Sequence, residues 1–124
     1  MSRVWGDANL LIRLITDDPP QMAAQAEAFL KRAEEGQFSV VLTPVTLAEC
    51  VWVLSSFYGF SREVIAEGLG KLLTNTGLEV LEKTAMYQAL EIMAEKNVDF
   101  IDAYLAAQAK LHDEPVASFD NSSV

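Results

Sequence analysis

The chain has 124 residues, of which 51% are hydrophobic and 22% are charged. This length and composition are typical of one globular domain and argue against disorder over the full length. Nine Lys and Arg residues against 18 Asp and Glu residues give a formal net charge of −9. That charge excludes a basic patch as the main means of binding a phosphate backbone. It does not exclude nucleic acid as a substrate, because bound metal ions can supply positive charge locally.

Cysteine and histidine are nearly absent, which disfavours several kinds of site. Cys50 is the single cysteine and His112 the single histidine, so we expect no internal disulfide, no zinc cluster and no histidine-based triad. No apolar run exceeds five residues, so no segment is expected to span a membrane. We therefore expect a cytoplasmic protein that forms a single domain over residues 1–124.

Hydrophobic spacing and turn residues predict short strands that alternate with longer helices. The helix that follows Pro20 is expected to place Met22 on its inner face, and the helix over 46–57 to be mostly buried, including Trp52. This alternation is typical of βαβ crossovers, so we predict an α/β fold with a parallel sheet covered by helices on both faces. The expected elements are a strand over 3–7, a helix over 9–15, a helix from the proline pair to about 35, a strand over 39–43, helices over 46–57 and 61–73, a strand over 78–81, helices over 84–96 and 99–112, and a last strand over 115–119.

Four acidic residues occupy positions next to the predicted sheet. Asp7 and Asp120 end predicted strands, and Glu49 and Asp102 lie in the first turn of predicted helices. In an open α/β sheet, ligands bind in the crevice at the carboxyl ends of the strands. Carboxylates that meet there would repel one another unless a hard dication such as Mg²⁺ or Mn²⁺ bound between them. One or two such ions could also bridge the carboxylates to a phosphodiester and activate an attacking water.

Each of these acids also has a purely structural interpretation. Thr46 and Glu49 have the spacing of a capping box. Asp99 could join a metal shell through water, but capping its helix is the favoured role, while Asp102 could interact with the positive end of the helix dipole. The two acids at strand ends could be turn residues. Position in the chain leaves both interpretations open.

Four sequence motifs resemble those of the PIN domain family, in the family's order and over nearly the whole chain. Residues 4–13 (VWGDANLLIR) resemble the first motif, in which an Asp ends the first strand. Residues 44–54 (PVTLAECVWVL) are similar to the second motif, which supplies a Glu. Residues 98–103 (VDFIDA) and 117–120 (ASFD) resemble the third motif and the weaker fourth, each of which supplies an Asp. The second and third motifs look most like those of VapC-type toxins of bacterial and archaeal toxin–antitoxin pairs.

The resemblance implies a three-layer α/β/α fold with a short central parallel sheet. It also implies a Mg²⁺- or Mn²⁺-dependent endoribonuclease that hydrolyses RNA phosphodiester bonds. Metal-ligand and catalytic roles fall on Asp7, Glu49, Asp102 and Asp120, and Asn9 would orient Asp7 from outside the metal shell. Such toxins commonly form homodimers, and a small antitoxin protein silences them by inserting a segment near the acidic pocket.

Two departures from the family pattern favour a second function. Ala8 stands where the family usually has Thr or Ser, so a hydrogen bond that would help to hold the pocket is missing. The chain also stops at Val124, where the family continues with a hydrophobic stretch and a last strand. The alternative hypothesis is therefore a catalytically weakened PIN-like module that acts through protein or RNA recognition.

Aromatic residues gather around the end of the predicted helix over 46–57. Trp52, Phe57, Tyr58 and Phe60 lie within nine positions of one another. Core packing is the expected role of these side chains. The same segment is also the candidate contact for a second copy of the chain or for an antitoxin.

Overall fold

Parallel strand pairing organises the sheet. The structure is a computed structural model that describes residues 2–118. Its strands are ordered β1-β2-β3 and all pair in parallel, with Val4 opposite Val40 and Val40 opposite Leu78. The elements are β1 (Ser2–Trp5), α1 (Ala8–Thr16), α2 (Pro20–Glu34), β2 (Phe38–Leu42), α3 (Pro44–Ser56), α4 (Arg62–Leu72), β3 (Leu78–Val80), α5 (Lys83–Lys96) and α6 (Phe100–His112). The predicted α/β fold with a parallel sheet is confirmed.

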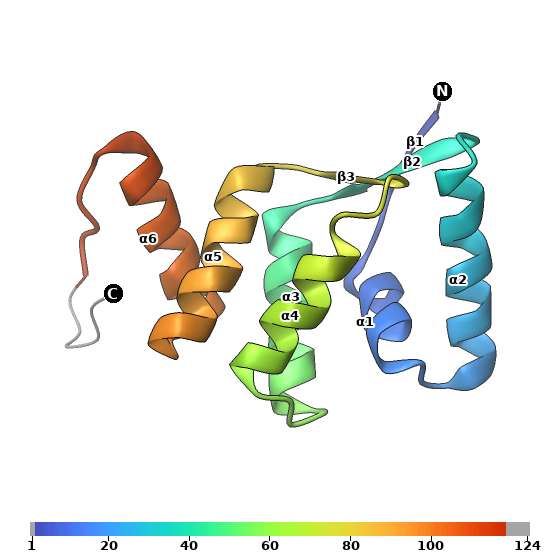
Figure 1. Ribbon diagram of the computed structural model, residues 1–124, viewed down its shortest axis with the longest axis horizontal. Coiled ribbons are helices and arrows are strands. Elements are labelled where there is room, and N and C mark those ends of the chain that lie inside the picture. The colour runs from blue at the N-terminus through green and yellow to red at the C-terminus, as the bar shows by residue number, and fades with distance from the viewer. Residues whose placement is uncertain (1, 119–124) are drawn as a thin grey trace.

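The helices are spread along the long axis of the molecule (Figure 1). α6 and α5 lie at one end, α3 and α4 in the middle, and α1 and α2 towards the other end. α6 packs mainly against α5 and has far less contact with α3. The elements that carry the predicted acids are therefore distributed over most of the length of the protein.

The core is built around the central strand. Val40, Val41 and Leu42 of β2 are fully buried, whereas all four residues of β1, which lies at the edge of the sheet, are exposed. A continuous run of apolar residues is typical of a strand buried on both faces. The largest fully buried side chains elsewhere are Leu11, Leu47, Leu54, Ile65, Leu69, Leu73, Met86 and Met93.

Two residues predicted to face inward are exposed. Trp52 is 67% exposed and Met22 is 42% exposed. In α3 the buried positions Leu47, Cys50 and Leu54 recur every three or four residues and occupy one helical face. Trp52 projects from another face of the same helix, so the prediction of an inward Trp52 was wrong.

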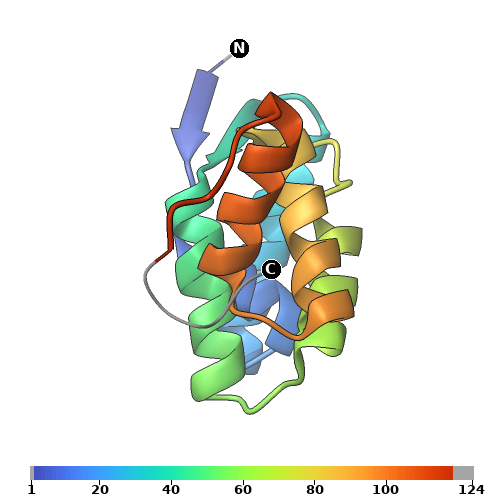
Figure 2. The same cartoon turned by 90° about the vertical axis from the view of Figure 1, so that its left-hand side faces the viewer.

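The last predicted strand does not form in the part of it that the structure describes. Residues 114–118 have no regular secondary structure, and Phe119 lies outside the described residues. Seen from the α6 end, this segment runs beside α6 (Figure 2), and Pro115 and Val116 line the same small pocket as Leu105 of α6. A strand needs a partner for its backbone groups, and here the segment lies against a helix and not against the free edge of β1. The prediction of a strand over 115–118 was therefore wrong.

None of the helices within residues 2–118 combines the length and the apolarity that a membrane-spanning helix requires.

Candidate active site

Asp7 lies where β1 ends and α1 begins. It is the N-cap residue of α1, and its Oδ1 accepts a hydrogen bond from the Leu10 N–H at 3.1 Å. The Gly6 N–H donates to the carbonyl of Val41 at 2.9 Å, which ties the exit of β1 to β2. A Cβ atom on Gly6 would come within 2.8 Å of Val40 Cγ1, so the close approach requires glycine. Asp7 is thus held in place through one carboxylate oxygen, and the other makes no hydrogen bond with a described residue.

Glu49 projects from α3 with no hydrogen bond or ion pair to any residue in the range 2–118. The helix begins at Pro44, and Thr43 caps it by accepting a hydrogen bond from the Thr46 N–H at 3.1 Å. The predicted capping box between Thr46 and Glu49 is therefore absent, because the helix starts earlier than the sequence indicated. Glu49 is exposed and lies in the second turn, where no helix end requires its charge.

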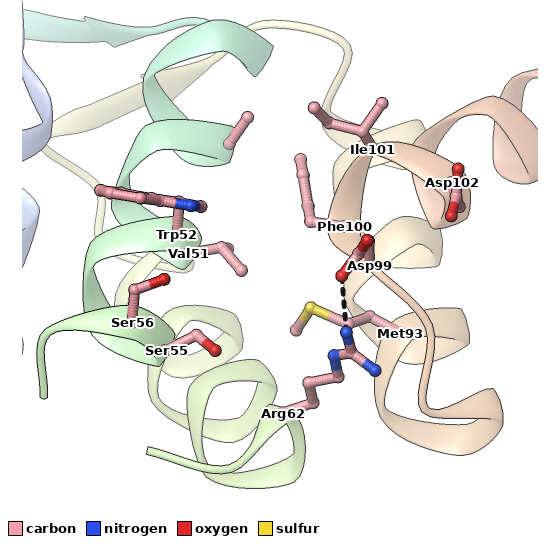
Figure 3. Close-up of a pocket in the computed structure, with 11 residues that line it drawn as sticks. Val51, Trp52, Ser55, Ser56, Arg62, Met93, Asp99, Phe100, Ile101 and Asp102 are labelled. Atoms are coloured by element: carbon pink, nitrogen blue, oxygen red, sulfur yellow. Dashed lines mark hydrogen bonds and ion pairs between the residues drawn. The ribbon is translucent and has the colours of Figure 1, made fainter. Parts of the chain in front are cut away.

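Asp102 lies in the first turn of α6, as predicted. It is half-buried and makes no hydrogen bond or ion pair with the described residues. Asp102 lines a pocket of about 510 Å³ between α3 and α6 (Figure 3). Arg62 and Asp99 are the other charged side chains of this pocket, and Trp52 faces it from α3.

Asp99 does not cap α6 with its side chain, which was its favoured role. It occupies the N-cap position of α6, but its side chain makes no capping hydrogen bond. Its Oδ1 instead accepts a charge-assisted hydrogen bond from Arg62 Nη2 at 2.6 Å. The prediction of a side-chain cap was wrong, since a tertiary partner at the start of α4 binds the carboxylate. The expected water-mediated metal role of Asp99 stays a prediction.

Two further residues, Asn9 and Asp120, were predicted to belong to the site. Asn9 is exposed and has no hydrogen bond to Asp7, or to any other residue that the structure describes. Asp120 lies outside the described residues. The orienting role of Asn9 and the ligand role of Asp120 stay predictions.

The donors fit a hard dication in kind. Asp7 has one carboxylate oxygen without a hydrogen bond, and Glu49 and Asp102 have no polar partner in the described part of the chain. Free carboxylate oxygens are the ligands that Mg²⁺ and Mn²⁺ prefer. Between residues 2 and 118, however, no three Asp, Glu, His or Cys side chains lie close enough together to hold one ion. The structure therefore does not bring Asp7, Glu49 and Asp102 together as a preformed set.

Cys50 has no nucleophilic role at this site. Its side chain is fully buried in the core, directly after Glu49. Desolvation, reinforced by the negative charge of Glu49, raises the pKa of the thiol to about 12. The thiolate is the nucleophilic form, so Cys50 acts as a small apolar core residue.

Sequence reasoning missed two polar residues that contact α6. Arg62 contacts the α5–α6 turn, and Glu82 accepts hydrogen bonds from Tyr104 at 2.6 Å and from Gln108. For Arg62 the sequence held one signal. A cation in the first turn of a helix faces the positive end of the helix dipole, so an Arg after the capping Ser61 indicates an anionic partner elsewhere.

Comparison with known protein families places the chain in one of them. The PIN domain matches residues 6–122, which include all four predicted acids. Searches among curated proteins and among solved structures find no significant match. The three parallel strands and six helices of the described residues are consistent with the PIN fold. The chain therefore belongs to the PIN domain family.

Proposed function

We propose that this protein is a Mg²⁺- or Mn²⁺-dependent endoribonuclease, the VapC-like toxin of a toxin–antitoxin pair that acts in the cytoplasm. The PIN domain is generally a nuclease fold. The observation that carries the proposal is that this chain keeps uncommitted carboxylates at Asp7, Glu49 and Asp102, the positions that match the family's acidic motifs.

Negative charge determines how such a domain can handle RNA. With a net charge of −9, the chain repels a phosphate backbone unless cations intervene. Asp7, Glu49 and Asp102, together with Asp120, would hold the ion, and a bound dication supplies Lewis acidity and an activated water. The contribution of Asp7 includes its position, because its cap on α1 fixes the carboxylate at the carboxyl end of β1.

Metal binding without RNA is the first test. A Mn²⁺ titration should raise the melting temperature, since an ion that binds only the folded state adds about 2.7 kcal/mol of stability at 100 times its Kd. Asp7→Asn combined with Glu49→Gln should abolish this increase and the Mn²⁺-dependent cleavage of single-stranded RNA. The metal-free variant should be about as stable as the parent, because Asn keeps the N-cap of α1 and Glu49 is exposed.

A charge-matched control separates site effects from net charge. Glu27→Gln combined with Glu95→Gln removes the same charge from exposed residues of α2 and α5, and it should keep the full increase in melting temperature. A parent protein that cuts no RNA with Mg²⁺ or Mn²⁺ refutes the proposed activity. A double variant of Asp7 and Glu49 that keeps the full increase locates the metal elsewhere.

Two large exposed side chains support the proposed protein partners. Phe57, at the end of α3, is 79% exposed, and Trp52, in the second half of this helix, is 67% exposed. The Phe57 ring packs edge-on against Tyr58, and Tyr58 stacks on Phe60, so the end of α3 presents a group of aromatic rings of the kind that marks protein contacts. We propose this surface for the homodimer or the antitoxin. Phe57→Glu should lower the mass measured by light scattering if the dimer uses it, and an unchanged dimeric mass removes that contact.

Ala8 supports the alternative of a weakened, recognition-only PIN-like module. Ala8 is 4% exposed at the start of α1 and supplies no hydroxyl group beside Asp7. Ala8→Thr should increase metal-dependent cleavage if the missing hydroxyl limits the rate. If neither the parent nor Ala8→Thr cuts RNA while RNA or a protein partner still binds, the recognition module is the correct function.

A further inference from the structure

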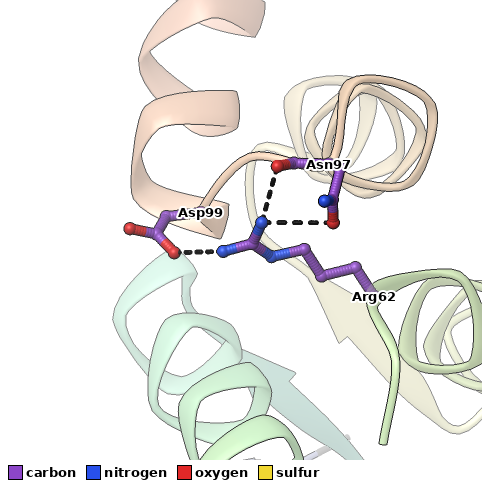
Figure 4. Close-up of polar contacts among 3 residues, drawn as sticks. All are labelled: Arg62, Asn97 and Asp99. Atoms are coloured by element: carbon purple, nitrogen blue, oxygen red, sulfur yellow. Dashed lines mark hydrogen bonds and ion pairs between the residues drawn. The ribbon is translucent and has the colours of Figure 1, made fainter. Parts of the chain in front are cut away.

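We propose that Arg62 is a positioning residue that determines where α6 holds Asp102. The inference rests on the proposed function, because it concerns the placement of a proposed metal ligand. Arg62 is the first residue of α4 and reaches the turn between α5 and α6 (Figure 4).

One guanidinium group binds both sides of this turn. Arg62 Nη1 donates to the Asn97 carbonyl at 2.6 Å and to Asn97 Oδ1 at 3.2 Å, and Nη2 donates to Asp99 Oδ1 at 2.6 Å. Asn97 ends α5 in the left-handed conformation, with a φ of 54°, and Asp99 precedes α6. Only Val98 separates the two residues. The planar fork of Arg can bind two acceptors in a fixed geometry, whereas the ammonium group of Lys cannot.

Both partners give up a favourable local arrangement in this contact. Arg62 places a positive charge at the N-terminus of α4, where the helix dipole disfavours it. Asp99 leaves α6 without the side-chain cap that its position would allow. Among residues 2–118, Arg62 is also the only cation that lines the pocket containing Asp102. These features indicate that the contact fixes the turn, since neither helix gains locally from it.

The turn between α5 and α6 also determines the position of Asp102. The Ala103 N–H donates to the Asp99 carbonyl at 2.9 Å, so Asp99 and Asp102 share the first turn of α6. α6 packs mainly on α5, and its contact with α3, which carries Glu49, is small. Arg62 therefore supplies a polar connection between the start of α6 and the α3–α4 part of the molecule. Losing it lowers the fraction of molecules in which Asp102 keeps its observed position. If metal binding draws on that position, the apparent metal affinity falls by the same fraction.

The first experiment measures Mn²⁺ binding without RNA. Arg62→Gln should raise the Mn²⁺ concentration that gives half of the increase in melting temperature by about tenfold, the lower end for residues that orient metal ligands. Asp99→Asn removes one of the three hydrogen bonds of Arg62, a water-exposed one, and should raise this concentration by no more than about twofold, and Arg62→Lys should restore only part of the loss. Lys71→Gln is the matched control, because it removes an exposed ion pair with Glu67 from the same helix. It should leave the Mn²⁺ dependence unchanged.

A double-mutant cycle distinguishes positioning from a general loss of structure. In an Asp102→Asn background, Arg62→Gln should cause no further change in the Mn²⁺ dependence, because the residue through which Arg62 acts is already lost. A full tenfold change in that background, or no change in the parent background, overturns the inference.

Hydrogen exchange tests the positioning independently of metal. Arg62→Gln should speed exchange of the Ala103 amide several-fold and leave the Ala107 amide unchanged, whereas Lys71→Gln should affect neither. If the parent binds no Mn²⁺ while the Ala103 amide responds as expected, the proposed function fails and the hold of Arg62 on α6 stands. Unchanged exchange at Ala103 overturns that hold, whatever the metal does.

Discussion

Five of the six helix N-termini in the described part of the chain fall into two groups, and α2, which follows Pro19, belongs to neither. α1, α3 and α4 are capped by their own preceding residues, because Asp7, Thr43 and Ser61 each accept a hydrogen bond from the N–H three positions on. The residues that precede α5 and α6 do not cap their helices. Glu82 binds Tyr104 and Gln108 on α6, and Asp99 binds Arg62 on α4.

The difference separates local stability from tertiary position. A local cap satisfies free N–H groups of its own helix and stabilises it wherever that helix packs. The side chains of Glu82 and Asp99 instead connect α6 to the β3–α5 junction and to α4. The two groups should therefore respond differently to substitution.

The largest expected effect is at Asp7, which belongs to the capping group and is also a proposed metal ligand. Asp7→Asn keeps the cap, since Asn is as good an N-cap as Asp, but removes the charge. It should reduce RNA cleavage by at least about 100-fold and change the free energy of unfolding by less than ~0.5 kcal/mol. Asp7→Ala should lose the activity and a further ~1 kcal/mol of stability in urea unfolding. Equal stabilities of the two variants would show that the cap contributes nothing.

The second expected effect compares the loss of stability at a capping residue with the loss at a residue that contacts another helix. Thr43→Ala leaves the Thr46 N–H without its acceptor and should destabilise the protein by about 1 kcal/mol, whereas Thr43→Ser should be nearly neutral. Asp99→Asn should cost less than ~0.5 kcal/mol, because its contact with Arg62 is exposed to water. Urea unfolding measures all three. A larger loss for Asp99→Asn than for Thr43→Ala contradicts the division into stabilising caps and positioning contacts.

The smallest expected effect is a change in the pKa of Tyr104, where α6 contacts Glu82. The hydrogen bond to Glu82 is the main cause of the raised pKa of Tyr104, and the hydrogen bond from Gln108 acts in the opposite direction. A raised pKa in the folded state contributes stability below the unfolded pKa of about 10, and this contribution is lost as pH rises through the folded pKa. Glu82→Gln should therefore lower the Tyr104 pKa and weaken the alkaline loss of stability.

Tyrosinate absorbance, with Tyr104→Phe subtracted, measures the titration of this side chain. If the Tyr104 titration in Glu82→Gln matches that of the parent, Glu82 does not hold α6 through Tyr104.

Local patterns predicted most of the fold. The strand over 39–43 was identifiable because a short β-branched run ends at a proline, and the observed strand is Phe38–Leu42. The helix expected over 84–96 forms as Lys83–Lys96, because its apolar spacing is strong enough to identify it alone. The PIN domain motifs placed the chain in its family, since each motif is a short contiguous segment.

The sequence by itself determined the features of the fold that depend on residues close together in the chain. These are the order of the strands and helices from β1 to α6 and the positions of their ends to within about two residues. Their physical basis is backbone hydrogen bonding and apolar periodicity over a few positions. The acidic residues of the four motif segments could be identified in the same way, and their role as metal ligands stays a prediction.

Only the tertiary structure decided which distant residues meet. It paired Arg62 with Asp99 across 37 positions, exposed Trp52 on α3, and left residues 114–118 beside α6 without a strand partner. It also left Asp7, Glu49 and Asp102 uncombined, with no metal-sized group of ligands in the described range. For an exposed acidic side chain, a local cap and an ion pair with a distant residue have similar free energies. The packing of α6 on α5 therefore decided which of the two interactions forms.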